Sequence, residues 1–371
     1  NRQRTGDAFD NVNRHVARLP RNISLEDAKN YSYTDAGGFT RQNFWNPGSN
    51  GGSNPYWTKN NVPAINERNR IMGFASLNYK ILPELSLTLR SGLDKYVDDV
   101  ELKWANNTYT IAEKGNYRVE QRDVMELNND FLFSYDKKIN EDFNISANFG
   151  GNIQQNKIIS SFTDNGGLTI ENFFTTGNAA AGTFDRSLLE REKQSLYATT
   201  DIGYKNLATL TLTGRNDWSS TLPKGSNSYF FSSAGITTIV SDIFTMPSFI
   251  NFAKIRASIA QTGNDADPYN LTQTYTSSVG GNGVIINRDS RLPISNLKPE
   301  ITTSQEAGID LRLFDSRINV EFTWFNSNSK NQLLPVTLPA ASGWSSEFIN
   351  AGNVKNSGIE LTVGGKIIKQ S

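Results

Sequence analysis

Apolar side chains occupy every second position in several stretches of the chain. In Leu207–Phe231, Leu210 and Leu212 fall on one parity, and Thr211 and Thr213 fall on the other. The same pattern recurs in stretches that begin at Ile71, Leu85, Met125, Phe143 and Ile318. Alternation with a period of two is typical of a β-strand whose two faces meet different surroundings. The sequence therefore predicts strands with one apolar face and one polar face.

The lengths of these stretches and of their connections favour a membrane barrel. The strands run for roughly 10 to 13 residues, whereas about 9 to 11 suffice for a tilted strand to cross a bilayer. Short turns follow Ile81, Tyr135, Tyr204 and Leu313, and a somewhat longer turn covers Ser241–Ile250. The connections between those hairpins are long polar segments: Glu101–Gln121, Lys157–Lys193, Gly263–Pro299 and Asn331–Lys355. Short periplasmic turns and long extracellular loops are the plan of an outer-membrane barrel.

Aromatic residues of the apolar parity mark the ends of the predicted strands. Those beside the short turns are Tyr79, Tyr135, Phe143 and Tyr204, and those expected at the opposite strand ends are Trp218 and Trp324. This placement predicts two aromatic girdles, one at each membrane interface. The alternative is that aromatic side chains simply favour strands.

The first seventy residues lack this alternation. We expect residues 1–70 to form a long extracellular loop region with a short helix, and residues 71–371 to form the transmembrane β-barrel strands. Ser24 is followed three residues later by Asp27, a capping-box-like start for that helix. The candidate ligand or lid contacts are the aromatic residues Phe39, Phe44, Trp45, Tyr56 and Trp57. They either pack the loop internally or meet a ligand or partner.

Composition narrows the class of protein without contradicting the strand pattern. The chain has 371 residues, with 37 Lys and Arg against 37 Asp and Glu, one His and no Cys. Such a balance argues against nucleic-acid binding, and the lack of Cys excludes disulfides and Cys-based metal sites. No signal peptide or transmembrane helix is predicted, because no long apolar run occurs. The mean hydropathy of −0.49 would suit a soluble protein, but a barrel with a polar lumen has the same weak signal.

No catalytic or cofactor site is predicted, and we do not expect an enzyme. The only His, His15, lies in an Arg-rich stretch and is expected on the surface. Asp265 and Asp267 could bind Ca²⁺, but they lack the spacing of an EF-hand, and a turn is the simpler explanation. The glycines of "VGGNGV" precede no Lys-Ser/Thr, so they form no phosphate loop. Carboxylates such as Glu126, Asp130, Glu306 and Asp310 are expected on the wetted wall of the lumen.

Four phrases resemble one family. They are "GRNDWSSTLPKGSNSYFF", "IRASIAQTGNDADPY", "NLKPEITTSQEAGIDLRLFDSRINVEFTWFNSNSKNQLL" and "NAGNVKNSGIELTV". They closely resemble the barrel of SusC/RagA-type TonB-dependent transporters of Bacteroidetes, and the likeness covers most of the region from Gln194 onward. The resemblance implies a 22-stranded barrel, a plug, a TonB-contacting segment and a SusD-like surface lipoprotein partner. We count about 11 strands and no plug or TonB-contacting segment, and we expect an internal part of a longer protein, roughly half of the barrel.

The function that we expect is therefore transport across the outer membrane. The chain would be part of a TonB-dependent importer of large nutrients, glycans or oligopeptides. Its partners would be outer-membrane lipids, the SusD-like lipoprotein and the TonB complex, the last through a segment outside this sequence. One alternative is a SusC-like barrel that serves as a structural subunit of a larger assembly or secretion complex. Another is a soluble β-rich carbohydrate-binding module.

Overall fold

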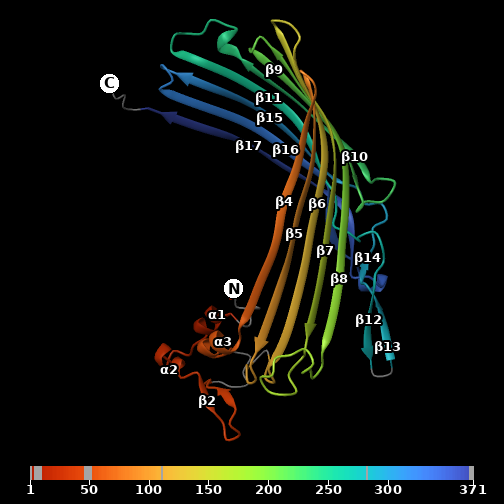
Figure 1. Cartoon of the computed structure of the whole chain (residues 1–371). Coiled ribbons are helices and arrows are strands. Elements are labelled where there is room, and N and C mark those ends of the chain that lie inside the picture. Colours follow the sequence, from red (N-terminus) through yellow and green to blue (C-terminus); the bar gives the residue numbers. More distant parts are fainter. Residues whose placement is uncertain (1, 4–10, 46–51, 110–111, 281–282, 367–371) are drawn as a thin grey trace. The chain divides into compact units, whose positions relative to one another are not determined.

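The computed structural model describes residues 2–3, 11–45, 52–109, 112–280 and 283–366, and these are mostly antiparallel β-structure (Figure 1). Eleven of the described strands are at least 12 residues long. They are β4 (Ala64–Leu82), β5 (Leu85–Trp104), β6 (Asn116–Lys138), β7 (Phe143–Asp164), β8 (Thr183–Tyr204), β9 (Ala208–Ser219), β10 (Ser228–Ile239), β11 (Ile250–Asn264), β15 (Glu300–Leu313), β16 (Ile318–Thr337) and β17 (Ser346–Gly365).

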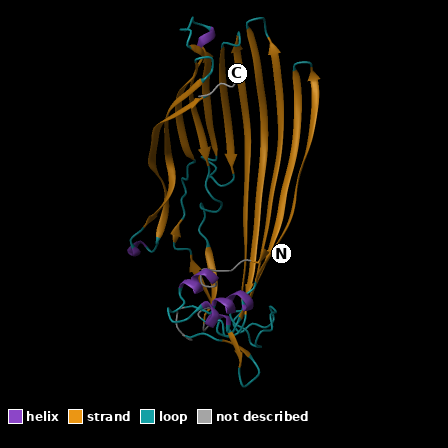
Figure 2. Ribbon diagram, turned by 90° about the vertical axis from the view of Figure 1, so that its left-hand side faces the viewer, coloured by secondary structure: helices purple, strands orange, loops and turns teal. Residues whose placement is uncertain are grey.

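The remaining elements are short (Figure 2). The helices are α1 (Val12–Ala17), α2 (Leu25–Lys29), α3 (Pro55–Asn61), and the 3₁₀ turns η1 (Val240–Asp242) and η2 (Ala340–Ser342). The short strands are β1 (Arg2–Gln3), β2 (Ser32–Thr34), β3 (Thr40–Gln42), β12 (Tyr275–Gly280), β13 (Gly283–Arg288) and β14 (Arg291–Leu292). No helix in the described ranges is long and apolar enough to span a membrane.

The described strands pair mainly in one sheet of 13 strands, in the order β1-β4-β5-β6-β7-β8-β9-β10-β11-β15-β16-β17-β14. Each of the 11 long strands, apart from the last, pairs with the long strand that follows it in the chain. The short strands β12, β13 and β14 lie in the connection between β11 and β15. Two further pairs, β2 with β3 and β12 with β13, form separate hairpins. Within the described residues β4 and β17 do not pair with each other, so this sheet is open.

The chain divides into two compact units. The first unit comprises Asn1–Gly73, Leu93–Glu126 and Asn156–Glu190. The second unit comprises Phe74–Gly92, Leu127–Gln155 and Arg191–Ser371.

Several strands are longer than the sequence pattern predicted, which corrects both the strand lengths and the boundary at residue 71. β4 to β8, β16 and β17 have between 19 and 23 residues, and β4 begins at Ala64. The added residues carry polar side chains on both faces, so they have no period of two. Cross-strand ion pairs hold them instead, such as Arg68 with Asp98 at 2.6 Å and Lys157 with Glu190 at 2.7 Å.

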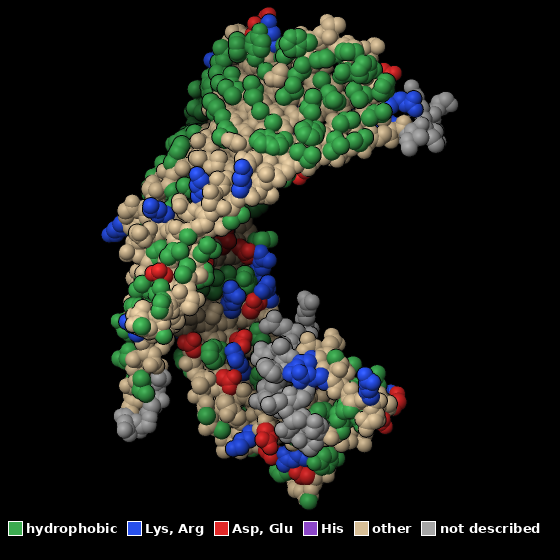
Figure 3. Space-filling view, turned by 180° about the vertical axis from the view of Figure 1, so that it is seen from behind, with side chains coloured by type: hydrophobic (Ala, Val, Ile, Leu, Met, Phe, Trp, Pro, Cys, Tyr) green, Lys and Arg blue, Asp and Glu red, His purple; other side chains and the backbone are tan. Residues whose placement is uncertain are grey.

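The second unit confirms the predicted division into two faces. On the apolar face, Leu212 lies opposite Ala234, and Trp324 lies opposite Ile359. Large hydrophobic side chains are exposed there: Leu89, Phe149, Leu196, Leu212, Ile236, Ile255, Ile259, Phe322, Trp324 and Leu361. Figure 3 shows such side chains as a broad hydrophobic surface beside the C-terminal strand. Hydrophobic side chains in this arrangement need an apolar neighbour outside the sheet.

The short turns lie where the sequence placed them, but only part of the girdle prediction survives. β4, β6, β8 and β15 end within three residues of the positions expected. Beside two of these turns, the rings of Phe143 and Tyr204 lie 5.0 Å apart, centroid to centroid. Trp218 lies next to the last residue of β9, as expected. The placement of Trp324 at a strand end is wrong, because β16 continues to Thr337 as a polar extension.

Candidate functional site

The N-terminal segment of the first unit is built on capped helices. Ser24 caps α2 as predicted: its hydroxyl accepts from the Asp27 N–H at 3.1 Å, and the Asp27 carboxylate accepts from the Ser24 N–H at 2.9 Å. Asn54 caps α3 by accepting from the Tyr56 N–H at 2.9 Å, and Pro55 occupies the first helical position. The segment therefore contains three short helices where the sequence predicted one.

The prediction that His15 lies on the surface is wrong. His15 is 2 % exposed, and its Nδ1 accepts from the Ser53 N–H at 3.1 Å. Its stretch folds as α1, so the arginines beside it in sequence occupy other positions around the helix while His15 faces inward.

Trp57 anchors α3 and is not available to a ligand. Its side chain is 1 % exposed, and its indole Nε1 donates to the Thr108 hydroxyl at 2.9 Å. That hydroxyl in turn donates to the carbonyl oxygen of Ala105 at 2.7 Å. The indole thus fixes α3 to the connection between β5 and β6, and internal packing is the correct interpretation at this position.

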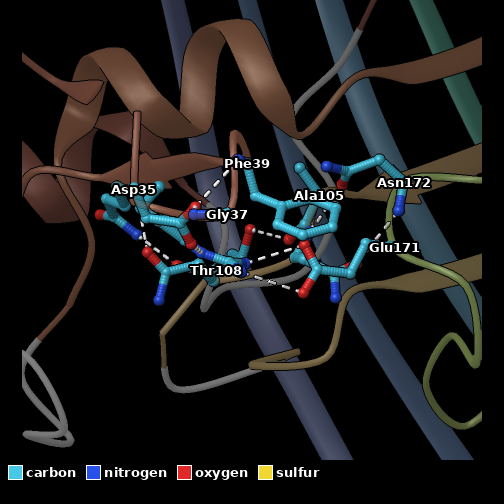
Figure 4. A network of polar contacts seen from close by, with 11 residues as sticks. Asp35, Gly37, Phe39, Ala105, Thr108, Glu171 and Asn172 are labelled. Atoms are coloured by element: carbon cyan, nitrogen blue, oxygen red, sulfur yellow. Dashed lines mark hydrogen bonds and ion pairs between the residues drawn. The ribbon is translucent and has the colours of Figure 1, made fainter. Parts of the chain in front are cut away.

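The β2–β3 hairpin is held by an arginine between two carboxylates (Figure 4). The Arg41 guanidinium donates to Asp35 at 2.7 Å, and to both oxygens of Glu171 at 2.9 and 3.1 Å. Such a bidentate pair fixes direction as well as distance. Glu171 belongs to the connection between β7 and β8, so one side chain ties the hairpin to a loop 130 residues further along the chain.

The pKa values of these groups follow from their contacts. The Asp35 carboxylate accepts from the Phe39 N–H at 2.9 Å and from Arg41, and these contacts lower its pKa below the usual value. Glu171 and then Asp35 raise the pKa of Arg41, which therefore stays charged at any working pH. The guanidinium also lies 5.2 Å from the centroid of the Phe39 ring, within range of a cation–π contact.

Paired amides join the same loops. The Gln42 N–H donates to the Asn107 side chain at 2.7 Å, and the Gln42 side chain donates to the Asn107 carbonyl at 3.0 Å. Asn106 and Asn172 exchange two bonds, each accepting with its side chain from the other's N–H at 2.9 and 3.2 Å (Figure 4). Three of these four bonds satisfy a backbone N–H, that of Gln42, Asn106 or Asn172. These bonds therefore tie the connection between β5 and β6 to β3 and to the connection between β7 and β8.

Four of the five predicted aromatics remain at least partly exposed in this segment. Phe39 is 46 % exposed, and Phe44, Trp45 and Tyr56 are half-buried. The Phe44 ring lies 4.9 Å from Trp45 and 5.9 Å from Tyr109, centroid to centroid. Exposed aromatic rings on a fixed backbone are suited to stacking on a sugar ring or a peptide side chain, because little conformational freedom is lost on binding.

The polar face of the second unit carries a ladder of cross-strand contacts. Asp310 on β15 pairs with Lys254 and, at 2.6 Å, with Arg256, both on β11. The Thr213 and Ser233 hydroxyls lie 2.6 Å apart, and the other contacts between polar side chains include Arg90–Asp130, Asn148–Thr199, Thr211–Asp201 and Ser304–Ser327. This wall offers charges of both signs and many hydroxyl and amide groups.

Nothing in the sequence indicated a buried cluster in the second unit. This cluster brings together residues from three of the four phrases that resemble SusC/RagA-type transporters. The buried side chains of Leu222, Tyr229, Ile294 and Leu297 form a small hydrophobic core. Beside it, the fully buried Asp265 carboxylate accepts from Arg191 and from the Ser219 hydroxyl. A pairing across 74 residues leaves no local signal in the sequence.

Asp265 therefore has a structural role, because it joins Arg191 to Ser219. The two roles considered from the sequence were a Ca²⁺ ligand and a simple turn residue. In the described part of the chain no group of three or more His, Asp or Glu side chains is placed to hold a metal ion.

The chain matches the family model "TonB dependent receptor-like, beta-barrel" over residues 8–367. It belongs to the TonB-dependent receptor family. Two curated relatives come from Formosa agariphila. TonB-dependent receptor P26 is 26 % identical over 272 residues, which are 69 % of this chain and 27 % of that protein. TonB-dependent receptor P3 is 31 % identical over 190 residues, which are 49 % of this chain and 19 % of that protein.

The fold of the TonB-dependent receptor barrel is also found in solved structures. The RagAB peptide transporter aligns with 91 % of this chain and 37 % of its own chain, at a TM-score of 0.79 and 18 % identity. The chain spans about a quarter of the length of receptor P26. Receptors of this family are outer-membrane proteins and not enzymes, so the apolar face meets lipid and the polar face lines the lumen. The alternative of a soluble carbohydrate-binding module is therefore wrong.

Proposed function

We propose that this chain forms part of an outer-membrane importer that takes up large nutrients, glycans or oligopeptides. The observation that carries the proposal is the separation of the two faces of the second unit. A wall of paired charges, hydroxyls and amides can bind a large polar solute through many replaceable contacts, while the opposite face stays in lipid. The likeness to RagAB, a peptide transporter, supports a substrate of this size.

The aromatic segment supplies the recognition surface in this proposal. Residues 1–70 would form the extracellular loop region, with Phe39, Phe44, Trp45 and Tyr56 as ligand or lid contacts. Trp57 and Arg41 would hold them in place through Thr108 and Glu171. Energy would come from the TonB complex through another segment of the whole protein, and a SusD-like surface lipoprotein would deliver the substrate.

Uptake by a strain whose only copy of the full-length receptor carries Phe44→Ala and Trp45→Ala tests the proposal. Truncating an aromatic anchor costs about 2 kcal/mol or more, so substrate affinity should fall about 30-fold while barrel abundance stays normal. Phe184→Ala is the matched control, because Phe184 is also an exposed aromatic of the first unit but lies on β8 outside the segment. A receptor that acts only as a structural subunit would show unchanged uptake in both strains, and that result would overturn the proposal.

A further inference from the structure

A notch interrupts the apolar face of the second unit. It lies across β6, β7, β8 and β9 and has a volume of about 770 Å³. The hydrophobic residues that line it are Phe131, Ile153, Leu196 and Trp218. All four have the parity of the lipid-facing side chains, so the notch opens toward the membrane and not toward the lumen.

Gly151 explains why the surface is hollow at this point. A Cβ on this residue would lie 2.5 Å from Cε1 of Phe131 and 2.9 Å from Cδ2 of Leu196. Because no side chain is present, both neighbours rest directly against the backbone of β7. Phe149 and Ile153, the next residues of the same parity on β7, remain 49 % and 43 % exposed. The face is therefore low over Gly151 and higher on either side of it.

The rim of the notch is polar. Its polar lining residues include Asn129, Glu192, Gln194, Ser220 and Asn227, and no Lys or Arg is among the residues that line the notch. The Glu192 carboxylate accepts from the Gln155 and Gln194 side chains, each at 2.8 Å and each on a different oxygen, and about two acceptor positions remain because a carboxylate has about four. A carboxylate without a lining cation repels an anionic group and attracts an amine.

An apolar notch with a polar rim matches the shape and the chemistry of one amphiphile. The notch is continuous with the lipid-facing surface, so the molecules that reach it in the membrane are lipids. We propose that it binds one membrane lipid with an amine in its headgroup. One acyl chain lies over Gly151 against Phe131, Leu196 and Trp218, and the ammonium group donates to Glu192 at the rim. A lipid over Trp324, which does not line the notch, lacks the contact with Glu192 and should exchange freely.

Trp218 provides a built-in probe of this site. The full-length receptor is placed in phosphatidylcholine vesicles that contain increasing fractions of phosphatidylethanolamine brominated on its acyl chains, which quenches nearby indoles. The difference between the fluorescence of the wild type and of Trp218→Phe isolates the notch. The difference for Trp324→Phe reports the open apolar face, since Trp324 is exposed there and does not line the notch.

We expect half-maximal quenching of Trp218 at a several-fold lower fraction of brominated lipid than that of Trp324. Glu192→Gln, a change at a partly exposed rim position, should bring the two curves together, while brominated phosphatidylcholine quenches both tryptophans as before. Brominated phosphatidylglycerol, which has no amine, should show no preference for Trp218. The proposal is overturned if Trp218 and Trp324 respond alike in the wild type, or if phosphatidylglycerol is preferred as strongly as phosphatidylethanolamine.

Discussion

Two neighbouring residues of β9 should differ sharply in the cost of the same substitution. Leu212 is 42 % exposed on the apolar face, where Thr200 and Ala234 lie opposite it on the two adjacent strands. Thr211 lies on the polar face, where its hydroxyl donates to the Asp201 carboxylate. Arginine at position 212 must therefore enter lipid, whereas arginine at position 211 stays in water next to a carboxylate.

The sizes of the two effects follow from these surroundings. Arginine on the lipid face costs about 2 to 4 kcal/mol near the middle of the bilayer, which lowers the ratio of folded to unfolded protein about 30- to 1000-fold. On the polar face the side chain remains hydrated, and an exposed pair with Asp201 offsets the lost hydroxyl contact within about 1 kcal/mol. Leu212→Arg should therefore be severe and Thr211→Arg nearly neutral.

The assay is equilibrium unfolding of the full-length receptor in lipid vesicles, together with the amount of assembled barrel in cells. Leu212→Met is the control, because it keeps an apolar side chain of similar volume and should cost less than about 1.5 kcal/mol. Single cysteines at the two positions complete the test. A small charged thiol reagent should label position 211 in membranes and leave position 212 shielded. Equal losses for the two arginine variants, or the reverse pattern of labelling, would refute the assignment of the faces.

Three further outcomes are expected. The lowered pKa of Asp35, caused first by the Phe39 N–H, means that its ionised form stabilises the hairpin at neutral pH. This contribution should start to fall below about pH 4 and be lost as the pH passes through the lower pKa of the folded state, seen as faster amide exchange in the turn; pH-independent exchange would contradict it. A cysteine at Thr176 should react with an impermeant thiol reagent on intact cells and one at Lys138 should not; equal labelling would contradict the topology. Asp265→Asn should destabilise the second unit by about 1.5 to 3 kcal/mol in urea unfolding, because the arginine paired with it loses its counter-charge; an unchanged midpoint would contradict the anchoring role.

The sequence by itself determined the faces of the strands and the places of the short turns. Both are local properties: alternation depends on neighbours two positions away, and a turn depends on a few consecutive residues. Leu210 and Leu212 therefore share the apolar face, and the hairpin after Tyr204 lies where it was expected. The cap at Ser24 was readable for the same reason, since its partner is only three residues away.

The tertiary structure alone decided which polar and aromatic residues meet. Arg41 finds Glu171 across 130 residues, and Asp265 finds Arg191 across 74. Burial separates Trp57 from the other four aromatics of the same segment, which are at least partly exposed, although all five looked equivalent in the sequence. The strand extensions were hidden because polar residues on both faces erase the period of two, and only pairing with a neighbouring strand fixes them as strand. Such contacts depend on register and on long-range packing, which a local pattern does not contain.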